Sequence, residues 1–244
     1  MQPTTAAVPR ATGGAGATRT CVELATTLAR AGHEVAVLDA DLATQGLAAR
    51  TPGRIDPDVT QVLVGEASIE DALVERPLDL EGTVAVCPAR APFERLARAA
   101  TPEAARRFEA AVERVDELFE YVLIDTPPVT TNLAVSAVTV ADRVAAVTPA
   151  SERGEDGLQR LRERLRDVGA APGLALATRA TDGHPVEEAD VSLPTMECPL
   201  DAAPICAEPD TEYAPPVAAA AEALFGVELE LSFEEDGLLA GRFG

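Results

Sequence analysis

The sequence predicts an α/β fold in which a doubly wound, mostly parallel sheet is flanked by helices. Short apolar runs rich in Val, Ala and Leu alternate with longer amphipathic segments, the order expected of strands and helices in such a sheet. The apolar runs show little alternation of polar and apolar residues, which is typical of strands buried on both faces. The 244 residues are enough for one large domain with a sizeable core.

Each predicted element has a local sequence signal. A first, central strand should end at Pro9, where proline removes a backbone donor just before a glycine-rich turn. The segment 101–119 begins with Thr101-Pro102-Glu103, in which Thr is a good helix cap and Pro suits the first helical position. The later strands are predicted at 33–41, 82–88, 121–128, 142–149 and 173–179. The helices are predicted at 17–31, 68–76, 101–119, 153–168 and 213–225.

The domain organisation is predicted to be simple. Residues 1–227 should form a single domain, because no clear linker or internal repeat interrupts the alternating pattern. Within it, residues 180–216 are rich in Pro, Asp, Glu and Ala and are predicted as an acidic, extended loop region. Residues 228–244 form an acidic C-terminal tail, predicted as a short edge strand with a mobile end.

The charge is the most unusual feature of the composition. The formal net charge is −21, and all 20 basic residues are Arg, since the chain contains no Lys. A strongly acidic surface with Arg in place of Lys is typical of proteins that stay soluble in concentrated salt. The composition therefore predicts a halophilic protein, and its negative field argues against nucleic-acid and membrane partners.

The cysteines and the hydropathy pattern favour a cytoplasmic protein. The four Cys residues, at 21, 87, 198 and 206, lack CxxC spacing and are predicted to be reduced thiols. No apolar run approaches 18 residues, and the first residues lack the pattern of a signal peptide.

A glycine-rich turn is the first candidate for chemistry. Gly13, Gly14 and Gly16 lie between the first strand and the first helix, where they would let backbone N–H groups turn toward a phosphate. Thr18 follows at the position from which a hydroxyl can bind Mg²⁺. The same glycines are also compatible with an ordinary strand-to-helix turn.

Three motifs, taken together and in order, resemble the ParA/MinD family of deviant Walker A P-loop ATPases, of the SIMIBI class. The family's KGGxGKT[ST] loop is matched by residues 12–19, its DxD motif by Asp39-Ala40-Asp41, and its Walker B strand by residues 121–128, with Asp125 as the acid. The resemblance covers about residues 8–178. It implies a P-loop NTPase fold and, as ligands, ATP and Mg²⁺.

The resemblance also implies roles for individual residues. The cofactor-binding loop would consist of Gly13, Gly14, Ala15, Gly16, Ala17, Thr18 and Arg19. Thr18, Asp39 and Asp125 would serve the metal, and Asp41 would be the catalytic residue that positions the attacking water. Two plainer interpretations stay open: Asp39 and Asp41 could cap nearby loops at a strand end, and Asp125 could be a turn residue before Pro-Pro.

The departures from the family pattern bear on function. The two lysines of the family's loop are replaced by Thr12 and Ala17, and neither has become Arg. The sequence therefore predicts a degenerate, haloarchaeal-type member with weak or no ATP hydrolysis, acting as a nucleotide-responsive or purely scaffolding module for an unidentified protein partner. Homodimer formation is a further expectation. It also stays open that the protein binds no cofactor. The alternative is an active Mg-ATPase in cellular positioning or partitioning, in which Arg10 or Arg19 replaces the lysines.

Overall fold

An eight-stranded sheet forms the centre of the protein, as seen in a computed structural model that describes all residues except 1, 172, 197–201, 203, 209–210 and 234–244. The strand order is β3-β4-β2-β5-β1-β6-β7-β8, and every pair is parallel except β3 with β4. The predicted doubly wound, mostly parallel sheet is confirmed. The strands are β1 (Thr5–Pro9), β2 (Glu34–Asp39), β3 (Val74–Glu75), β4 (Thr83–Cys87), β5 (Tyr121–Thr126), β6 (Arg143–Pro149), β7 (Leu174–Ala180) and β8 (Val191–Pro194).

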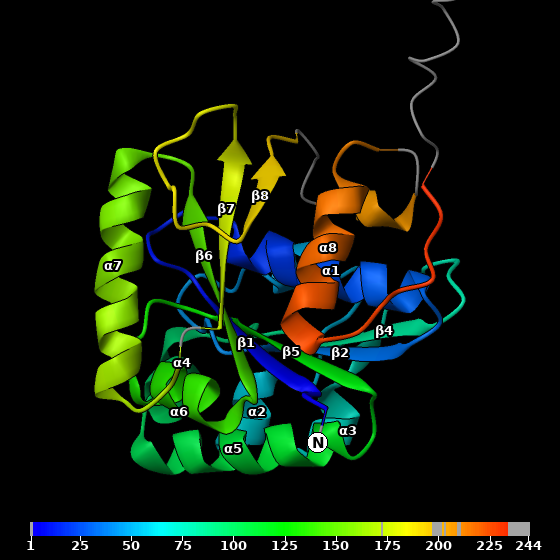
Figure 1. Cartoon of the computed structure of the whole chain (residues 1–244). Helices are drawn as coiled ribbons and strands as arrows, with labels where there is room; N and C mark the ends of the chain where they lie inside the picture. The colour runs from blue at the N-terminus through cyan, green and yellow to red at the C-terminus, as the bar shows by residue number, and fades with distance from the viewer. Residues whose placement is uncertain (1, 172, 197–201, 203, 209–210, 234–244) are drawn as a thin grey trace, which may run out of the picture.

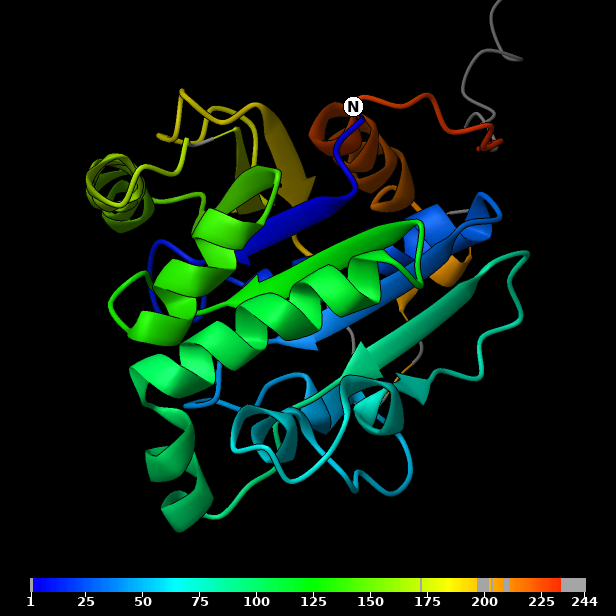
Figure 2. The same cartoon turned by 90° about the horizontal axis from the view of Figure 1, so that it is seen from below.

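Helices cover both faces of this sheet (Figure 1). One face carries α1 (Ala17–Arg30) and α8 (Ala214–Phe225), which pack against each other and against the short turn η2 (Ile205–Ala207). Figure 2, the view from below, shows the long helix α5 and helix α6 lying across the opposite face. The helices of that second layer are α2 (Val59–Leu63), α3 (Ile69–Ala72), α4 (Phe93–Ala99), α5 (Pro102–Asp116), α6 (Asn132–Val140) and α7 (Glu152–Asp167).

The core is divided by the sheet into two apolar clusters. In β1, Ala6 and Val8 pack toward α1 and α8, whereas Ala7 packs toward the helices of the other layer. All three are fully buried. Because side chains alternate across a strand, a strand covered on both faces must be apolar at every position. This explains the apolar runs without alternation from which the fold was predicted.

The boundaries of most predicted elements agree with the structure within a few residues, and the exceptions have local causes. The segment 68–76 is not one helix, because α3 ends at Ala72 and the chain then forms β3. The extended loop predicted for 180–216 is wrong in part, since β8 and η2 lie within it. Residues 228–233 form no strand, and the rest of the predicted tail lies outside the described residues. Helices α2, α4 and α6 were not predicted; they are too short or too uniformly apolar to show a helical period.

Helix α7 approaches the sheet at a glycine. A Cβ built on Gly154 would lie 1.9 Å from the carbonyl oxygen of Pro149, at the end of β6. The Thr148 hydroxyl also donates to the Gly154 carbonyl oxygen, at 2.6 Å. The helix can therefore reach the end of β6 only without a side chain at this position.

We expect Gly154→Ala to lower the free energy of unfolding by about 1–3 kcal/mol, because overpacking outweighs the gain in helix propensity. Denaturant unfolding in concentrated salt measures the change. Arg160→Ala, at an exposed position of the same helix, is the control and should change stability by less than about 0.5 kcal/mol. A Gly154→Ala protein as stable as the wild type would contradict the close approach.

Candidate functional site

The glycine loop lies between β1 and α1, at the edge of the sheet where the parallel strands end. Gly14 and Gly16 have φ values of 72° and 93°, in the left-handed region that favours glycine. A Cβ built on Gly13 or Gly14 would meet nothing within 4 Å, so the loop borders open space. No side chain of the described residues caps the first turn of α1. The free amides of a helix N-terminus can therefore face an anion in this loop.

The end of β7 holds the loop in this orientation. The Thr178 hydroxyl donates to the carbonyl oxygen of Ala15 at 2.7 Å, and the Arg179 guanidinium donates to the carbonyl oxygen of Gly14. Arg179 itself has a left-handed backbone, with φ of 54°. Because these carbonyls point toward β7, the loop amides are free to point elsewhere. The polar end of an otherwise apolar strand was the sequence signal for these two residues.

The three candidate acids, Asp39, Asp41 and Asp125, are fully buried at the ends of β2 and β5. Asp39 and Asp125 lie opposite each other in the register of these strands. Asp39 is occupied by backbone groups, since it accepts from the amides of Asp41 at 2.9 Å and Ala89 at 3.1 Å. Burial, with the neighbouring Asp125 charge, holds the pKa of Asp39 well above its usual range. The contacts of Asp39 are those of a carboxylate that caps a loop, whereas the alternative role was binding of the metal ion.

Asp125 has a different environment. Neither of its oxygens makes a hydrogen bond among the described residues, although both are buried. Burial raises the pKa of Asp125 to about 7, and the nearby Thr18 hydroxyl lowers it in part. An unpaired carboxylate close to a hydroxyl is a donor set that a hard cation such as Mg²⁺ prefers. The residues at this position therefore fit the implied metal ion.

Asp41 is held by an ion pair. The guanidinium of Arg10, which follows β1 directly, donates to Asp41 Oδ2, and so does the Thr44 hydroxyl. The other oxygen, Oδ1, is buried and has no partner among the described residues. The positive charge of Arg10 also lowers the pKa of Asp125. Arg10 thus places a cation among the acids, although it stands at neither of the loop's lysine positions.

The lysine positions themselves carry short side chains. Ala17 is 2% exposed and belongs to the core cluster beneath α1. The Thr12 methyl lies 2.5 Å from an ideal Cβ on Gly157, so Thr12 packs against α7. Arg19 pairs through Nε with the buried carboxylate of Glu23 at 2.5 Å. Arg19 also lines a cavity of about 230 Å³ beside the glycine loop, together with Thr178, Arg179 and Tyr213.

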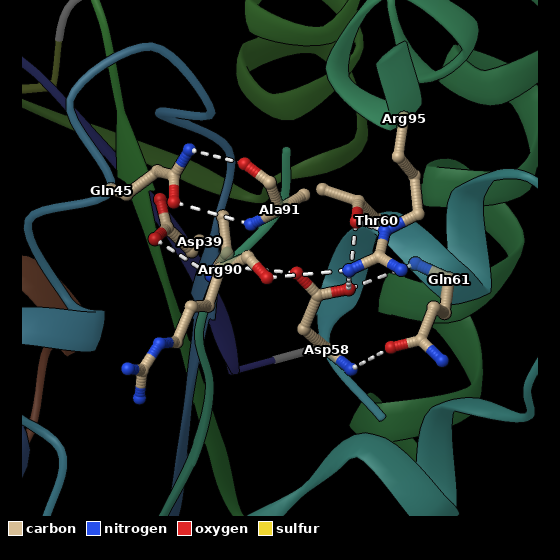
Figure 3. Close-up of polar contacts among 9 residues, drawn as sticks. Asp39, Gln45, Asp58, Thr60, Gln61, Arg90, Ala91 and Arg95 are labelled. Atoms are coloured by element: carbon tan, nitrogen blue, oxygen red, sulfur yellow. Dashed lines mark hydrogen bonds and ion pairs between the residues drawn. The ribbon is translucent and has the colours of Figure 1, made fainter. Parts of the chain in front are cut away.

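A second polar network joins the region after Asp41 to the connection between β4 and α4 (Figure 3). Three consecutive amides of this connection, those of Ala89, Arg90 and Ala91, donate to Asp39, Asp58 and Gln45 at 3.1, 2.6 and 3.2 Å. Gln45 also donates to the Ala91 carbonyl oxygen at 3.2 Å.

Asp58 is buried and additionally accepts from the Thr60 hydroxyl and the Gln61 amide, and it forms an ion pair with Arg95 at 3.5 Å. Asp58, Gln45 and their partners were not among the residues predicted for the site. The Asp58-x-x-Gln61 capping box that starts α2 was the available signal.

Sequence comparison places the chain among known P-loop proteins. A family model described as an AAA domain (AAA_31) matches residues 4–174. An uncharacterised ATP-binding protein of Methanocaldococcus jannaschii is 35% identical over 142 residues, which cover 58% of this chain and 51% of that protein. The chromosome partitioning protein ParA of Caulobacter vibrioides is 33% identical over 168 residues, covering 66% of this chain and 62% of ParA. The matched region thus spans about half to three fifths of these curated relatives.

Structural comparison agrees in fold. The septum site-determining protein MinD of Pyrococcus horikoshii, solved in complex with Mg-ADP, superposes with a TM-score of 0.74. The superposition covers 89% of this chain and 95% of MinD, at 21% sequence identity.

Two kinds of feature are absent from the described residues. They contain no helix of the length and apolarity needed to cross a membrane. They also contain no group of three or more His, Cys, Asp or Glu side chains arranged to hold a metal ion. Thr18 and Asp125 would thus leave the other positions around Mg²⁺ to water and phosphate, as is usual for this ion.

Asp125→Asn should make the protein more stable at pH 8, by on the order of 2 kcal/mol, because it removes a buried and unpaired charge. Since the pKa of Asp125 is raised to about 7, wild-type Asp125 gains a proton as the pH falls below 7, and the difference between the two proteins should then shrink. Urea unfolding at pH 8 and pH 5 tests this.

Asp58→Asn is the matched control for this experiment. Asp58 is equally buried but accepts hydrogen bonds from three donor groups, so its substitution should destabilise the protein. An Asp125→Asn protein that is less stable than the wild type at pH 8 would show that Asp125 is paired after all.

Proposed function

The chain belongs to the ParA/MinD family of P-loop ATPases, and on this premise we propose that it is a degenerate member that works as a nucleotide-responsive interaction module. It binds Mg-ATP weakly and hydrolyses it slowly or not at all. Its main role is to bind a protein partner, either in response to nucleotide or as a scaffold.

The observation that carries this proposal is the filling of the two lysine positions. Thr12 and Ala17 carry short, uncharged side chains, so neither offers a cation to the glycine loop. Each charge-assisted contact with phosphate contributes about 1.5–3 kcal/mol, and more where charge develops during transfer. Loss of both contacts weakens triphosphate binding and slows hydrolysis further.

The remaining residues support residual binding. Thr18 and Asp125 would hold Mg²⁺, which neutralises phosphate charge when bound. The loop amides and the N-terminus of α1 would contact phosphate oxygens. Asp41 stands at the position from which the family orients water, but its pairing with Arg10 opposes that role.

The proposal includes a setting for this module. We propose a halophilic, cytoplasmic protein that forms homodimers and binds a protein partner, without nucleic acid or membrane. The net charge of −21 without Lys supports the salt adaptation and opposes binding to polyanions.

A second candidate, an active ATPase in positioning or partitioning, is favoured by one observation. Arg10 brings a guanidinium beside Asp41 and close enough to Asp125 to lower its pKa. An arriving phosphate could draw Arg10 away from Asp41, which would supply the missing cation and release the acid in one step. Arg19 is the weaker substitute, because it pairs with Glu23.

Introducing a lysine at position 17 tests the proposal that the glycine loop is degenerate. We expect Ala17→Lys to tighten Mg-ATP binding roughly ten- to a hundredfold, because it adds a charge-assisted phosphate contact. Isothermal titration in concentrated KCl measures the affinity, and Ala17→Met, which adds a side chain without charge, should give no gain. Wild-type turnover comparable to that of active family members would refute the proposal. A further gain from Thr12→Lys would indicate a dimer interface.

Substitution of Arg10 separates the two candidates. If Arg10 only restrains Asp41, Arg10→Gln leaves Mg-ATP affinity unchanged or slightly higher. If Arg10 replaces a lysine, the same variant loses about tenfold or more in affinity and its hydrolysis falls. Arg54→Gln, at an exposed ion pair, is the control and should behave as the wild type.

A further inference from the structure

Arg76 is a buried arginine in the connection between β3 and β4, outside the glycine loop. It is 7% exposed, and its Nε and Nη1 atoms have no hydrogen-bond partner among the described residues. Its backbone is fixed, since its amide donates to the Val84 carbonyl oxygen at 2.8 Å and its carbonyl accepts from Leu78 at 2.8 Å. Burial lowers the pKa of Arg76. A guanidinium in this state is costly unless an anion joins it.

Two adjoining cavities lie against the Arg76 side chain. The smaller, of about 10 Å³, is lined by Arg76, Arg19, Arg50 and Glu23, among others, and has room for about one water molecule or oxyanion oxygen. The larger, of about 260 Å³, is shared by Arg76 and Arg50 and has apolar walls that include Pro52, Pro77 and Leu78. A small polar recess and a larger space with several apolar walls thus share the Arg76 and Arg50 side chains.

Guanidinium groups are prominent among the described lining residues of the recess. Three guanidinium groups line it, and Glu23 is the one acid among its described lining residues. The Glu23 carboxylate already accepts from Arg19 Nε and from the amides of Ile205 and Cys206, at 3.1 and 2.9 Å. It is therefore committed to these partners. The two buried donor atoms of Arg76 that lack a partner among the described residues therefore suit an anionic ligand.

We propose that Arg76 anchors a second anion-binding site, which takes a small phosphate monoester. The phosphate oxygens lie on Arg76 with the help of Arg50, and the organic group occupies the cavity beside Pro52, Pro77 and Leu78. A guanidinium can donate two parallel hydrogen bonds to phosphate, which favours this group over a compact halide ion. The site adjoins α1 on the side of Glu23 and shares Arg19 and Arg50 with the cavity beside the glycine loop. Arg76 does not line that cavity among the described residues, so the proposal for Arg76 stands apart from the proposed nucleotide function.

Titration with phenyl phosphate, inorganic phosphate and benzoate, at ionic strength held constant with KCl, tests the assignment. We expect phenyl phosphate to bind most tightly, because its ring can occupy the apolar cavity. Arg76→Gln should weaken this binding about tenfold or more. The same variant should have a higher Tm than the wild type without ligand, since an unpaired buried charge is removed.

Two control variants and one alternative variant complete the test. Arg106→Gln, at an exposed ion pair on α5, and Arg10→Gln, at the glycine loop, should both retain binding. Arg76→Met replaces Arg76→Gln if the latter does not fold. Equal affinity for phenyl phosphate and inorganic phosphate would indicate a site for inorganic phosphate and would overturn the assignment to a phosphate monoester. The proposal would be overturned if the wild type did not bind phenyl phosphate, or if it bound benzoate more tightly than phenyl phosphate. It would also be overturned if the Arg76 variant bound phenyl phosphate as tightly as the wild type, or if Arg10→Gln lost this binding.

Discussion

The ion pair between Arg10 and Asp41 brings a positive charge into a cluster of buried acids. Three fully buried carboxylates, those of Asp39, Asp41 and Asp125, meet where β2 and β5 end. Burial without compensation would drive such groups to their neutral forms or unfold the region. Arg10 follows β1, which pairs with β5, so the strand order itself brings a guanidinium to the acids. The same cation lowers the pKa of Asp125.

The three acids are stabilised in different ways, and this difference separates structural from functional roles. Asp39 accepts two backbone amides and holds the connection after β4. Asp41 is paired with a cation and a hydroxyl. Asp125 alone among them has both oxygens buried without a hydrogen bond. Asp125 therefore has oxygens that remain available to a cation, whereas those of Asp39 are occupied by backbone amides.

Arginine takes several distinct structural positions in this lysine-free chain. Arg19 holds Glu23 and through it the amides of η2, and Arg95 donates to Thr60 beside buried Asp58. Arg179 fixes the carbonyl of Gly14. The guanidinium suits these places because it offers several donors in one plane. Thr12 and Ala17, by contrast, are uncharged residues at the two positions where the family's loop pattern has lysine.

The sequence by itself determined the sheet, the glycine loop and the set of acids. Strands with unbroken apolar runs must be covered on both faces of the sheet, and this pattern can be read from the sequence. Glycine at positions 14 and 16 permits the left-handed backbone of the loop, which is a local feature. Tertiary structure alone decided which groups the acids meet. The pairing of Arg10 with Asp41, the commitment of Arg19 to Glu23 and the burial of Arg76 join residues from separate elements. No periodic pattern encodes such contacts, because they depend on the direction of each side chain after the strands and helices have packed.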